Sequence, residues 1–482
     1  GRSLYPLSKF KKSRDSFGKE GASLKHKKMK KFYYLLLTTI LLFSSCSDDD
    51  GLTSADVTSA VNAAIAAANI PSTAEITSAV TSAVNAAMAS GTDIDQAIAD
   101  ALAAQATAPE TVGIEGGVTV IETSATWTND RVWIMNGKVV VRNGGVLNIQ
   151  AGTIVKAGSG TGADASVLVI AKGGQINAIG TATAPIIFTD IGDNISYGDN
   201  GVSPNRNPSD MGLWGSVVVL GNAKVGEDGG TDDIEGIADG FDWTEYGGSN
   251  DTESSGRLEY VSIRHSGQTL TGDNELQGLT LGGVGSGTVV NHIEIIGSQD
   301  DGIEIFGGSV NVSNLVIHFN GDDAIDLDEG YKGTISNAVI ALTASTDGAF
   351  EIDGTEDSTG TIDGQYTLQN VTVYGSSTQE DTSQYGNWKS DATGLNQNIV
   401  YKLFNTGTTI AGIDADTYGG LGTATAAGSN LFNNFDFVTT DALSTIMPSA
   451  ITDGATWAET VTSQVASTGA DESVLSWTLL VD

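Results

Sequence analysis

A short acidic motif recurs three times at nearly constant spacing in the middle of the chain. The segments SQDDGIEIFGG, NGDDAIDLDEG and STDGAFEIDG each contain an acidic turn, followed by an acidic residue between two large apolar residues. The central acids, at intervals of 22 and 25 residues, are Glu304, Asp326 and Glu351. A second series, at intervals of 23, 23 and 33 residues, consists of Asn291, Asn314, Asn337 and Asn370.

This repeat constrains the fold class. A repeating unit of roughly 22 residues suits one coil of a parallel β-helix, in which three short strands alternate with three turns and strands of successive coils stack about 4.8 Å apart. A β-sandwich does not predict two series in one register. We therefore predict an all-β fold, a right-handed parallel β-helix, over residues 112–405, where short β-branched runs are separated by Gly, Asn and Asp.

The asparagine series is interpreted as structural. Stacked amides at a turn can hydrogen-bond from coil to coil and tolerate a left-handed backbone. Residues 406–482 are less regular, and we expect them to cap the open end of the solenoid, with VLSWTLLVD as a last strand.

The N-terminal region carries an export signal. KHKKMKKFYYLLLTTILLFSSC has a basic start, an apolar run too short to span a bilayer, and small residues before the only cysteine of the chain. We expect residues 1–28 to lie upstream of the true start, residues 29–45 to be a lipoprotein signal peptide, and Cys46 to be lipidated. The alternative is an ordinary cleaved signal with a chance cysteine. One cysteine also excludes an intramolecular disulfide.

Residues 52–108 are rich in Ala, Ser and Thr. A narrow apolar stripe at four-residue spacing predicts short helices broken at Pro71 and Gly91. We interpret this Ala-rich segment as a helical spacer, which leaves oligomerisation through it open; a flexible linker is the alternative.

The charge of the chain is strongly negative and unevenly distributed. Lys and Arg number 23 against 59 Asp and Glu, and eleven of the basic residues but only two of the acids precede Cys46. This distribution excludes nucleic acid as a partner, since no basic patch remains to neutralise phosphates.

Several segments resemble a known family. GTATAPIIFTD, GLWGSVVVLGNA, SGRLEYVSIRHSG, NELQGLTLGGVGSGTVV, DDGIEIFGG and DDAIDLDEGYKG are similar to secreted Bacteroidota lipoproteins of pectin-lyase-like architecture. Residues 46–51 contain Cys46 and an acidic stretch, SDDD, that resembles the surface-export tag of such lipoproteins. This resemblance implies an outer-membrane protein exposed at the cell surface. The resemblance implies fold and location, and it brings no settled activity with it.

Strand alternation turns the acidic series outward, because the flanking apolar residues point into the coil. Glu304, Asp326 and Glu351 then form one row, and a second row at the preceding turn consists of Asp300, Asp301, Asp322, Asp323 and Asp347. Rows of carboxylates suit Ca²⁺, which prefers hard oxygen ligands. A solvated acidic face is the alternative.

A catalytic alternative rests on the turn NGDDAI, which resembles the aspartate turn of polygalacturonases. The resemblance implies that Asp322 and Asp323 act as general acid and base. The other motifs of that family, Gly-His-Gly and Arg-Ile-Lys, are absent from the chain. A lyase mechanism needs a basic residue near Ca²⁺, but Lys332 is the only Lys or Arg between Arg264 and Lys389.

Trp214, Trp243 and Trp388 fall near turns and are candidates for stacking on sugar rings, with a core or loop-anchoring role as the alternative. Together these observations favour a non-catalytic, cation-dependent surface protein that binds glycan or matrix. A polysaccharide lyase or hydrolase and an accessory lipoprotein of an outer-membrane uptake system are the alternatives.

Overall fold

The computed structural model describes residues 81–82, 84–86 and 108–480, the last range with short gaps. The gaps are residues 198, 238–240, 270–274, 345, 356, 359–363, 377–383, 411, 414–417, 423–428, 450, 452 and 466. Residues 110–482 belong to one compact unit and residues 15–109 to another. Residues 81–82 and 84–86 are helical, whereas the signal peptide, Cys46 and the rest of the predicted spacer lie outside the described residues. No helix in the described part of the chain has the length and apolarity needed to cross a membrane.

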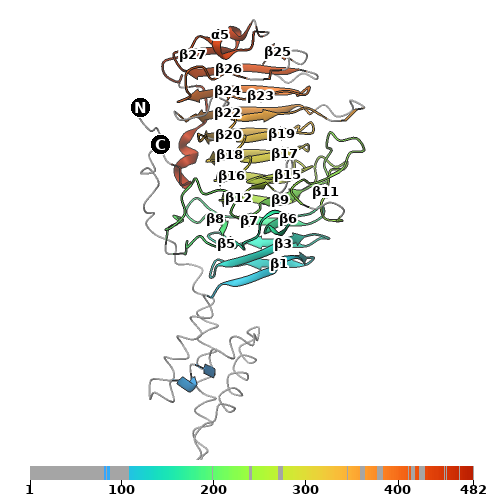
Figure 1. The fold of residues 1–482 in the computed structure, drawn as a ribbon. Coiled ribbons are helices and arrows are strands. Elements are labelled where there is room, and N and C mark those ends of the chain that lie inside the picture. The colour runs from blue at the N-terminus through green and yellow to red at the C-terminus, as the bar shows by residue number, and fades with distance from the viewer. Residues whose placement is uncertain are drawn as a thin grey trace, which may run out of the picture. The chain divides into compact units, whose positions relative to one another are not determined.

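The larger unit is a right-handed parallel β-helix, as predicted (Figure 1). One sheet of 23 strands winds through successive coils, and every strand pair in it is parallel. The coils have three faces, which we call A, B and C.

Face A carries the acidic series. Its strands are the second halves of β1 (Glu110–Ile121) and β3 (Trp133–Val141), followed by β6 (Val167–Ile170), β9 (Val217–Leu220), β15 (Leu279–Gly282), β17 (Ile303–Phe306), β19 (Ile325–Asp328), β21 (Phe350–Ile352) and β23 (Asn387–Trp388).

Faces B and C share the long strands of the later coils. Face B begins with β2 (Ser124–Trp127), β4 (Val146–Ile149) and β7 (Gln175–Ile179), and face C with the first halves of β1 and β3, then β5 (Ile154–Ala157) and β8 (Ile186–Asp190). Both continue through β12 (Gly256–Arg264), β16 (Val289–Ile296), β18 (Asn311–His318), β20 (Thr334–Ala341), β22 (Tyr366–Tyr374), β24 (Gly394–Lys402) and β26 (Asn430–Val438). β25 (Tyr418–Leu421) pairs with the first half of β26, and β27 (Ala458–Val461) with its second half.

Each long strand bends between faces B and C at a residue with positive φ. Asn314, Asn337 and Asn370 occupy this position with φ of 56°, 59° and 58°. The Asn337 amide donates to Asn314 Oδ1 at 2.7 Å, so the predicted asparagine ladder is confirmed. Asn291 lies one residue earlier, opposite Ser313, and His292 takes the left-handed position. The Oδ1 atom of Asn291 still accepts from the Asn314 amide at 2.8 Å.

The interior of the coils is apolar because strand alternation turns one set of side chains inward. Ile303, Ile305, Ile325 and Leu327, which flank the acids, are buried in the main core. The predicted orientation of the acidic series, outward from the coil, is therefore confirmed.

Long connections interrupt the coils before the acidic series. Residues 221–255, which we call the excursion, connect β9 to β12 and contain the antiparallel pair β10 (Asp232–Asp233) and β11 (Glu245–Tyr246). A second antiparallel pair, β13 (Gln268–Thr269) and β14 (Glu275–Leu276), precedes β15, and η2 (Gly162–Asp164) precedes β6. Apolar side chains of the excursion pack on the outer surface of face A in one buried cluster, which includes Val169, Val218, Ile234, Trp243 and Tyr246.

The C-terminal region differs from the prediction. The coils continue past residue 405 through β26 and β27, and side chains near α5 (Leu443–Ile446) and η3 (Gly454–Thr456) join the main core. The described residues of VLSWTLLVD, 474–480, form no strand. η4 (Glu472–Trp477) lies along the side of the solenoid, drawn red in Figure 1. Its Leu475 packs on Val316 and Val339 of face C, because outward apolar residues there need a cover. The described residues between 467 and 480 thus cover a side and do not cap an end.

Candidate cation-binding site

The outward side chains of face A change character along the solenoid. One register row runs through strands β3, β6, β9, β15, β17, β19, β21 and β23 as Val140, Val169, Val218, Thr280, Glu304, Asp326, Glu351 and Asn387. The excursion covers the apolar members of this row. Three carboxylates therefore stand side by side in successive coils, in the register aligned from the sequence.

The acids are more buried than an outward row suggests. Asp301, Glu304 and Asp323 are only 6%, 6% and 1% exposed. Gln277 donates to Glu235 of the excursion at 2.7 Å and to Asp300 at 3.3 Å. Loop residues thus meet the acidic rows, so these carboxylates do not form a simple solvated face.

Asp301, Glu304 and Asp326 form the most enclosed group, which we call the central triad. One carboxylate oxygen of each lies within 4.8 Å of the others. The backbone N–H of Asp323 donates to Asp301 Oδ1 at 2.8 Å. Glu304 Oε2 and Asp326 Oδ1 are buried and have no hydrogen-bond partner. Buried polar atoms without partners are rare, and they indicate a missing ion, water or proton.

The pKa values of the central triad also indicate that these carboxyl groups bind protons or a cation. Burial, and secondarily the neighbouring carboxylates, raise the pKa of Asp301, Glu304 and Asp326 well above their ordinary values. Burial likewise raises the pKa of Asp300 and of Glu235 to about 7. These groups need protons or a bound cation, because several buried like charges cannot all ionise without compensation.

A second group lies at the adjacent turns. Oxygens of Asp322, Asp323 and Asp347 lie within 4.8 Å of one another, with Asp322 exposed and Asp323 buried. Burial raises the pKa of Asp322, and that of Asp323 rises well above normal through burial and a contact with Glu351. Lys389 pairs with Glu351 and, at 3.2 Å, with Asp353. No other ion pair reaches the eight predicted acids within the described residues.

The structure brings all eight predicted acids into adjoining coils, but it does not support the predicted catalytic pair. Asp323 is 1% exposed and its N–H is tied to Asp301. A general acid or base must reach the glycosidic oxygen or the attacking water. Asp323 therefore contacts neighbouring residues of the solenoid and is not accessible to a polymer.

The three candidate tryptophans are also not available for stacking on sugar rings. Trp214 and Trp388 are fully buried and Trp243 is 4% exposed. The indole of Trp214 donates to the carbonyl of Arg264 at 2.7 Å, and that of Trp388 to Asn396 at 3.0 Å. Trp214 and Trp388 belong to the main core inside the coils, and Trp243 belongs to the buried cluster beneath the excursion. The three rings therefore offer no free face to a sugar.

Sequence reasoning missed Glu235 and Gln277. Both belong to irregular connections outside the repeat, so no periodic signal singles them out. Only the folded excursion brings Glu235 to within hydrogen-bond distance of Gln277, 42 residues away.

Comparison with known proteins gives one family. Residues 119–479 match the model described as pectate-lyase-like beta helix domain. No curated protein and no solved structure matches the chain. The match describes an architecture and assigns no residue a role.

Proposed function

Since the chain belongs to the pectate-lyase-like beta helix domain family, whose fold alone does not define an activity, we propose its function from its acidic site. The protein is a non-catalytic binding protein that holds a divalent cation of the Ca²⁺ type on face A. It attaches through that cation-loaded face to an acidic polysaccharide or matrix.

The central triad carries this proposal. Three carboxylates converge, those of Asp301 and Glu304 buried and that of Asp326 half-buried, and two of their oxygens are buried without a partner. Ca²⁺ accepts six to eight oxygen ligands at about 2.3–2.6 Å in flexible geometries, so waters and backbone carbonyls can complete a shell begun by three carboxylates. A bound cation also compensates the charge of these carboxylates, whose pKa values are raised by burial and by their mutual repulsion.

The acidity of the chain supports an acidic ligand only through a cation. A formal net charge of −36 repels a polyanion. Asp322 and Asp347 lie next to the central triad and are less buried than Asp323. A cation held near them can bridge protein and uronate carboxylates. The signal sequence and Cys46 support display of this face at the outer surface of an outer membrane, as a lipid-anchored protein.

The enzyme alternative draws on the architecture and on the acidic turn NGDDAI. A lyase needs a free basic residue beside the cation, but Lys389 is engaged by Glu351 and Asp353. A hydrolase needs two reachable carboxyl groups, and Asp323 is buried.

The test combines cation binding with an activity assay on the whole protein. Calorimetry measures Ca²⁺ binding, and Ca²⁺ at about one hundred times its Kd is expected to stabilise the fold by about 2.7 kcal/mol. The double variant Glu304→Gln, Asp326→Asn is expected to lose this stabilisation. Glu459→Gln, an exposed acid of β27, is the control and is expected to keep it.

Sedimentation with polygalacturonate, with Ca²⁺ or with chelator, measures ligand binding. We expect Ca²⁺-dependent co-sedimentation without reducing ends or unsaturated products. Turnover that Asp322→Asn abolishes would establish an enzyme instead, and equal Ca²⁺ binding by the double variant would exclude the central triad as the cation site.

A further inference from the structure

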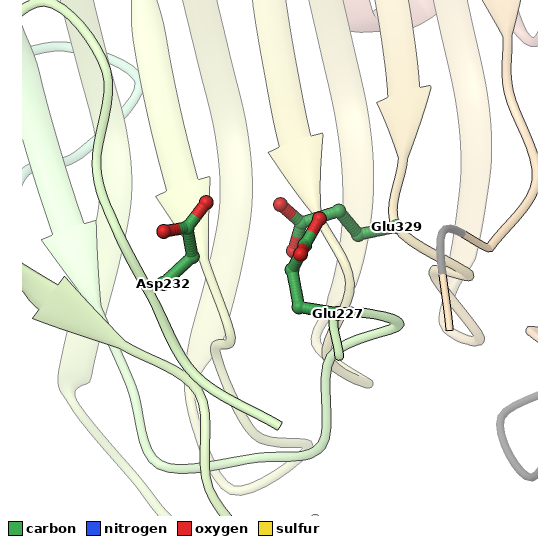
Figure 2. Close-up of side chains that lie close together, drawn as sticks. All are labelled: Glu227, Asp232 and Glu329. Atoms are coloured by element: carbon green, nitrogen blue, oxygen red, sulfur yellow. The ribbon is translucent and has the colours of Figure 1, made fainter. Parts of the chain in front are cut away.

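A third group of carboxyls lies apart from the acidic rows, where the excursion meets the end of β19. Glu227 and Asp232 belong to the excursion, and Glu329 directly follows β19. One oxygen of each lies within 4.8 Å of the others, and Figure 2 shows the three carboxyl groups turned toward one another. Two segments about one hundred residues apart in the sequence therefore build one group, which we call the latch triad.

Glu329 is the fixed member of the latch triad. Its backbone is left-handed, with φ of 49°, and its side chain is 5% exposed. The hydroxyl of Tyr246 donates to Glu329 Oε1, whereas the buried Oε2 has no hydrogen-bond partner. A carboxylate oxygen buried without a partner is costly unless an ion or a proton meets it.

Backbone contacts hold the excursion at this point. The N–H of Gly226 donates to the carbonyl of Glu329 at 2.8 Å, and the Thr355 hydroxyl donates to the carbonyl of Gly226 at 3.1 Å. Tyr246 packs on Phe306 with ring centroids 5.8 Å apart. The positions of Glu227 and Glu329 are thus set by contacts that do not need the carboxylates to attract one another.

The two nearby lysines pair with an acid outside the latch triad. Lys224 and Lys332 both pair with Asp251, at 3.9 and 2.5 Å. Asp232 and Glu329 form no ion pair within the described part of the chain. Burial raises the pKa of Glu329 to about 9, which agrees with an uncompensated site. Three carboxylates that converge from two segments, one of them with an orphaned buried oxygen, present the donor set of a hard divalent cation.

We propose that Glu227, Asp232 and Glu329 form a second divalent-cation site, distinct from the central triad, that fastens the excursion to the coil of β19. Calcium suits it best, because carboxylates contributed by two segments adapt more easily to a large, flexible coordination shell than to the octahedral shell of Mg²⁺. The excursion also carries Glu235, which meets the acidic rows. A cation here therefore stabilises the cover of the central triad.

The test is calcium stoichiometry on the whole protein, with hydrogen exchange as the second measurement. Asp232→Asn changes an exposed residue and is expected to keep the fold; Glu329→Gln keeps the shape of the buried side chain. Each is expected to lose one equivalent of bound Ca²⁺ and to exchange faster in residues 226–237 and 241–247. Glu245→Gln, which removes an acid of the same excursion that pairs with Lys172, is the matched control and is expected to keep full stoichiometry.

The outcomes separate the two sites. Wild-type stoichiometry in both folded variants, Asp232→Asn and Glu329→Gln, overturns the latch triad and leaves the central triad untouched. Loss of one equivalent in these variants, and of a different equivalent in Glu304→Gln, Asp326→Asn, establishes two sites. If Glu304→Gln, Asp326→Asn keeps full stoichiometry while Asp232→Asn and Glu329→Gln each lose one equivalent, the latch triad still stands as a cation site. Its test therefore does not depend on the proposed function.

Discussion

At the scale of single residues, the acids of face A and the latch triad make stability depend on pH in an unusual direction. Asp300 and Glu235 have pKa values raised to about 7, and Glu329 to about 9, against ordinary values near 4. A raised pKa in the folded state means that the folded state binds the proton more tightly. The stability that these groups contribute is then fully present at a pH below their ordinary pKa values. It is lost as the pH rises through their raised pKa values.

In chelator, the midpoint of thermal unfolding is therefore expected to fall between pH 4 and pH 9, with the steepest part near pH 7. Most carboxylate-rich proteins gain stability over the lower part of this range. Saturating Ca²⁺ is expected to flatten the fall, because the cation replaces the protons. A midpoint that rises from pH 5 to pH 8 in chelator would show that the carboxylates are compensated by other means.

The asparagine corner gives a second prediction at this scale. Asn337 is left-handed, donates to Asn314, and accepts the N–H of Asp471 at 2.7 Å. Asn337→Gly removes these side-chain bonds and a longer one to the Asp471 carbonyl at 3.4 Å, each worth at most about 1 kcal/mol, but keeps the backbone unstrained. Asn337→Ala adds about 1 kcal/mol of left-handed strain. In urea, the free energy of unfolding should be highest for the wild type, lower for Asn337→Gly and lowest for Asn337→Ala. Equal free energies of the two variants would mean that the backbone at this position relaxes.

The sequence predicted the residues that repeat and missed the ones that cover them. Strand alternation and spacing were enough to align Glu304 with Asp326 and Glu351, since local period determines both orientation and register. The burial of Glu304 depends on the excursion, and no local pattern reveals where a long connection packs. For the same reason Trp214 and Trp388, placed near turns by sequence, proved to be interior residues.

At the scale of elements, the end of the solenoid was placed too early because long connections hide the period. Asn398 and Asn434 continue the ladder at spacings of 28 and 36 residues, each donating to the amide of the preceding coil. In the sequence, a coil can be recognised only where equivalent residues are about 22 positions apart. The stacked amides show that coils β24 and β26 obey the same geometry with longer turns.

The C-terminal segment is expected to stabilise the solenoid from the side. Leu475 packs on Val316 and Val339, and the N–H of Leu479 donates to the buried Glu294 at 2.6 Å. Leu475→Ala is expected to lower the free energy of unfolding by about 2 kcal/mol, since it opens a cavity in a small cluster. The matched change at Leu421, which is 52% exposed, should stay within about 0.5 kcal/mol. Equal effects in denaturant unfolding would show that η4 does not pack tightly.

At the scale of the whole molecule, one face of a single stack changes from apolar to acidic. In its first coils face A is sealed by the excursion, and in its later coils it presents carboxylates. Each coil contacts mainly its neighbours, so a solenoid is stabilised nearly one coil at a time. A ligand bound to a few coils then acts on those coils and on the elements that pack against them.

This locality predicts where Ca²⁺ protects the chain. In hydrogen exchange of the whole protein, Ca²⁺ is expected to slow exchange in β17, β19 and β21 and in the described parts of the excursion, and to leave β4, β5 and β7 unchanged. The reason is that the members of the two triads lie on β17, on β19, in the turns next to these strands and in the excursion, and that β21 pairs with β19. The variant Glu304→Gln, Asp326→Asn should lose the protection of β17 and β19 while the excursion keeps its own. Slowing spread evenly over all coils would mean that the stack opens as one cooperative unit, and the two sites would then have to be separated by stoichiometry alone.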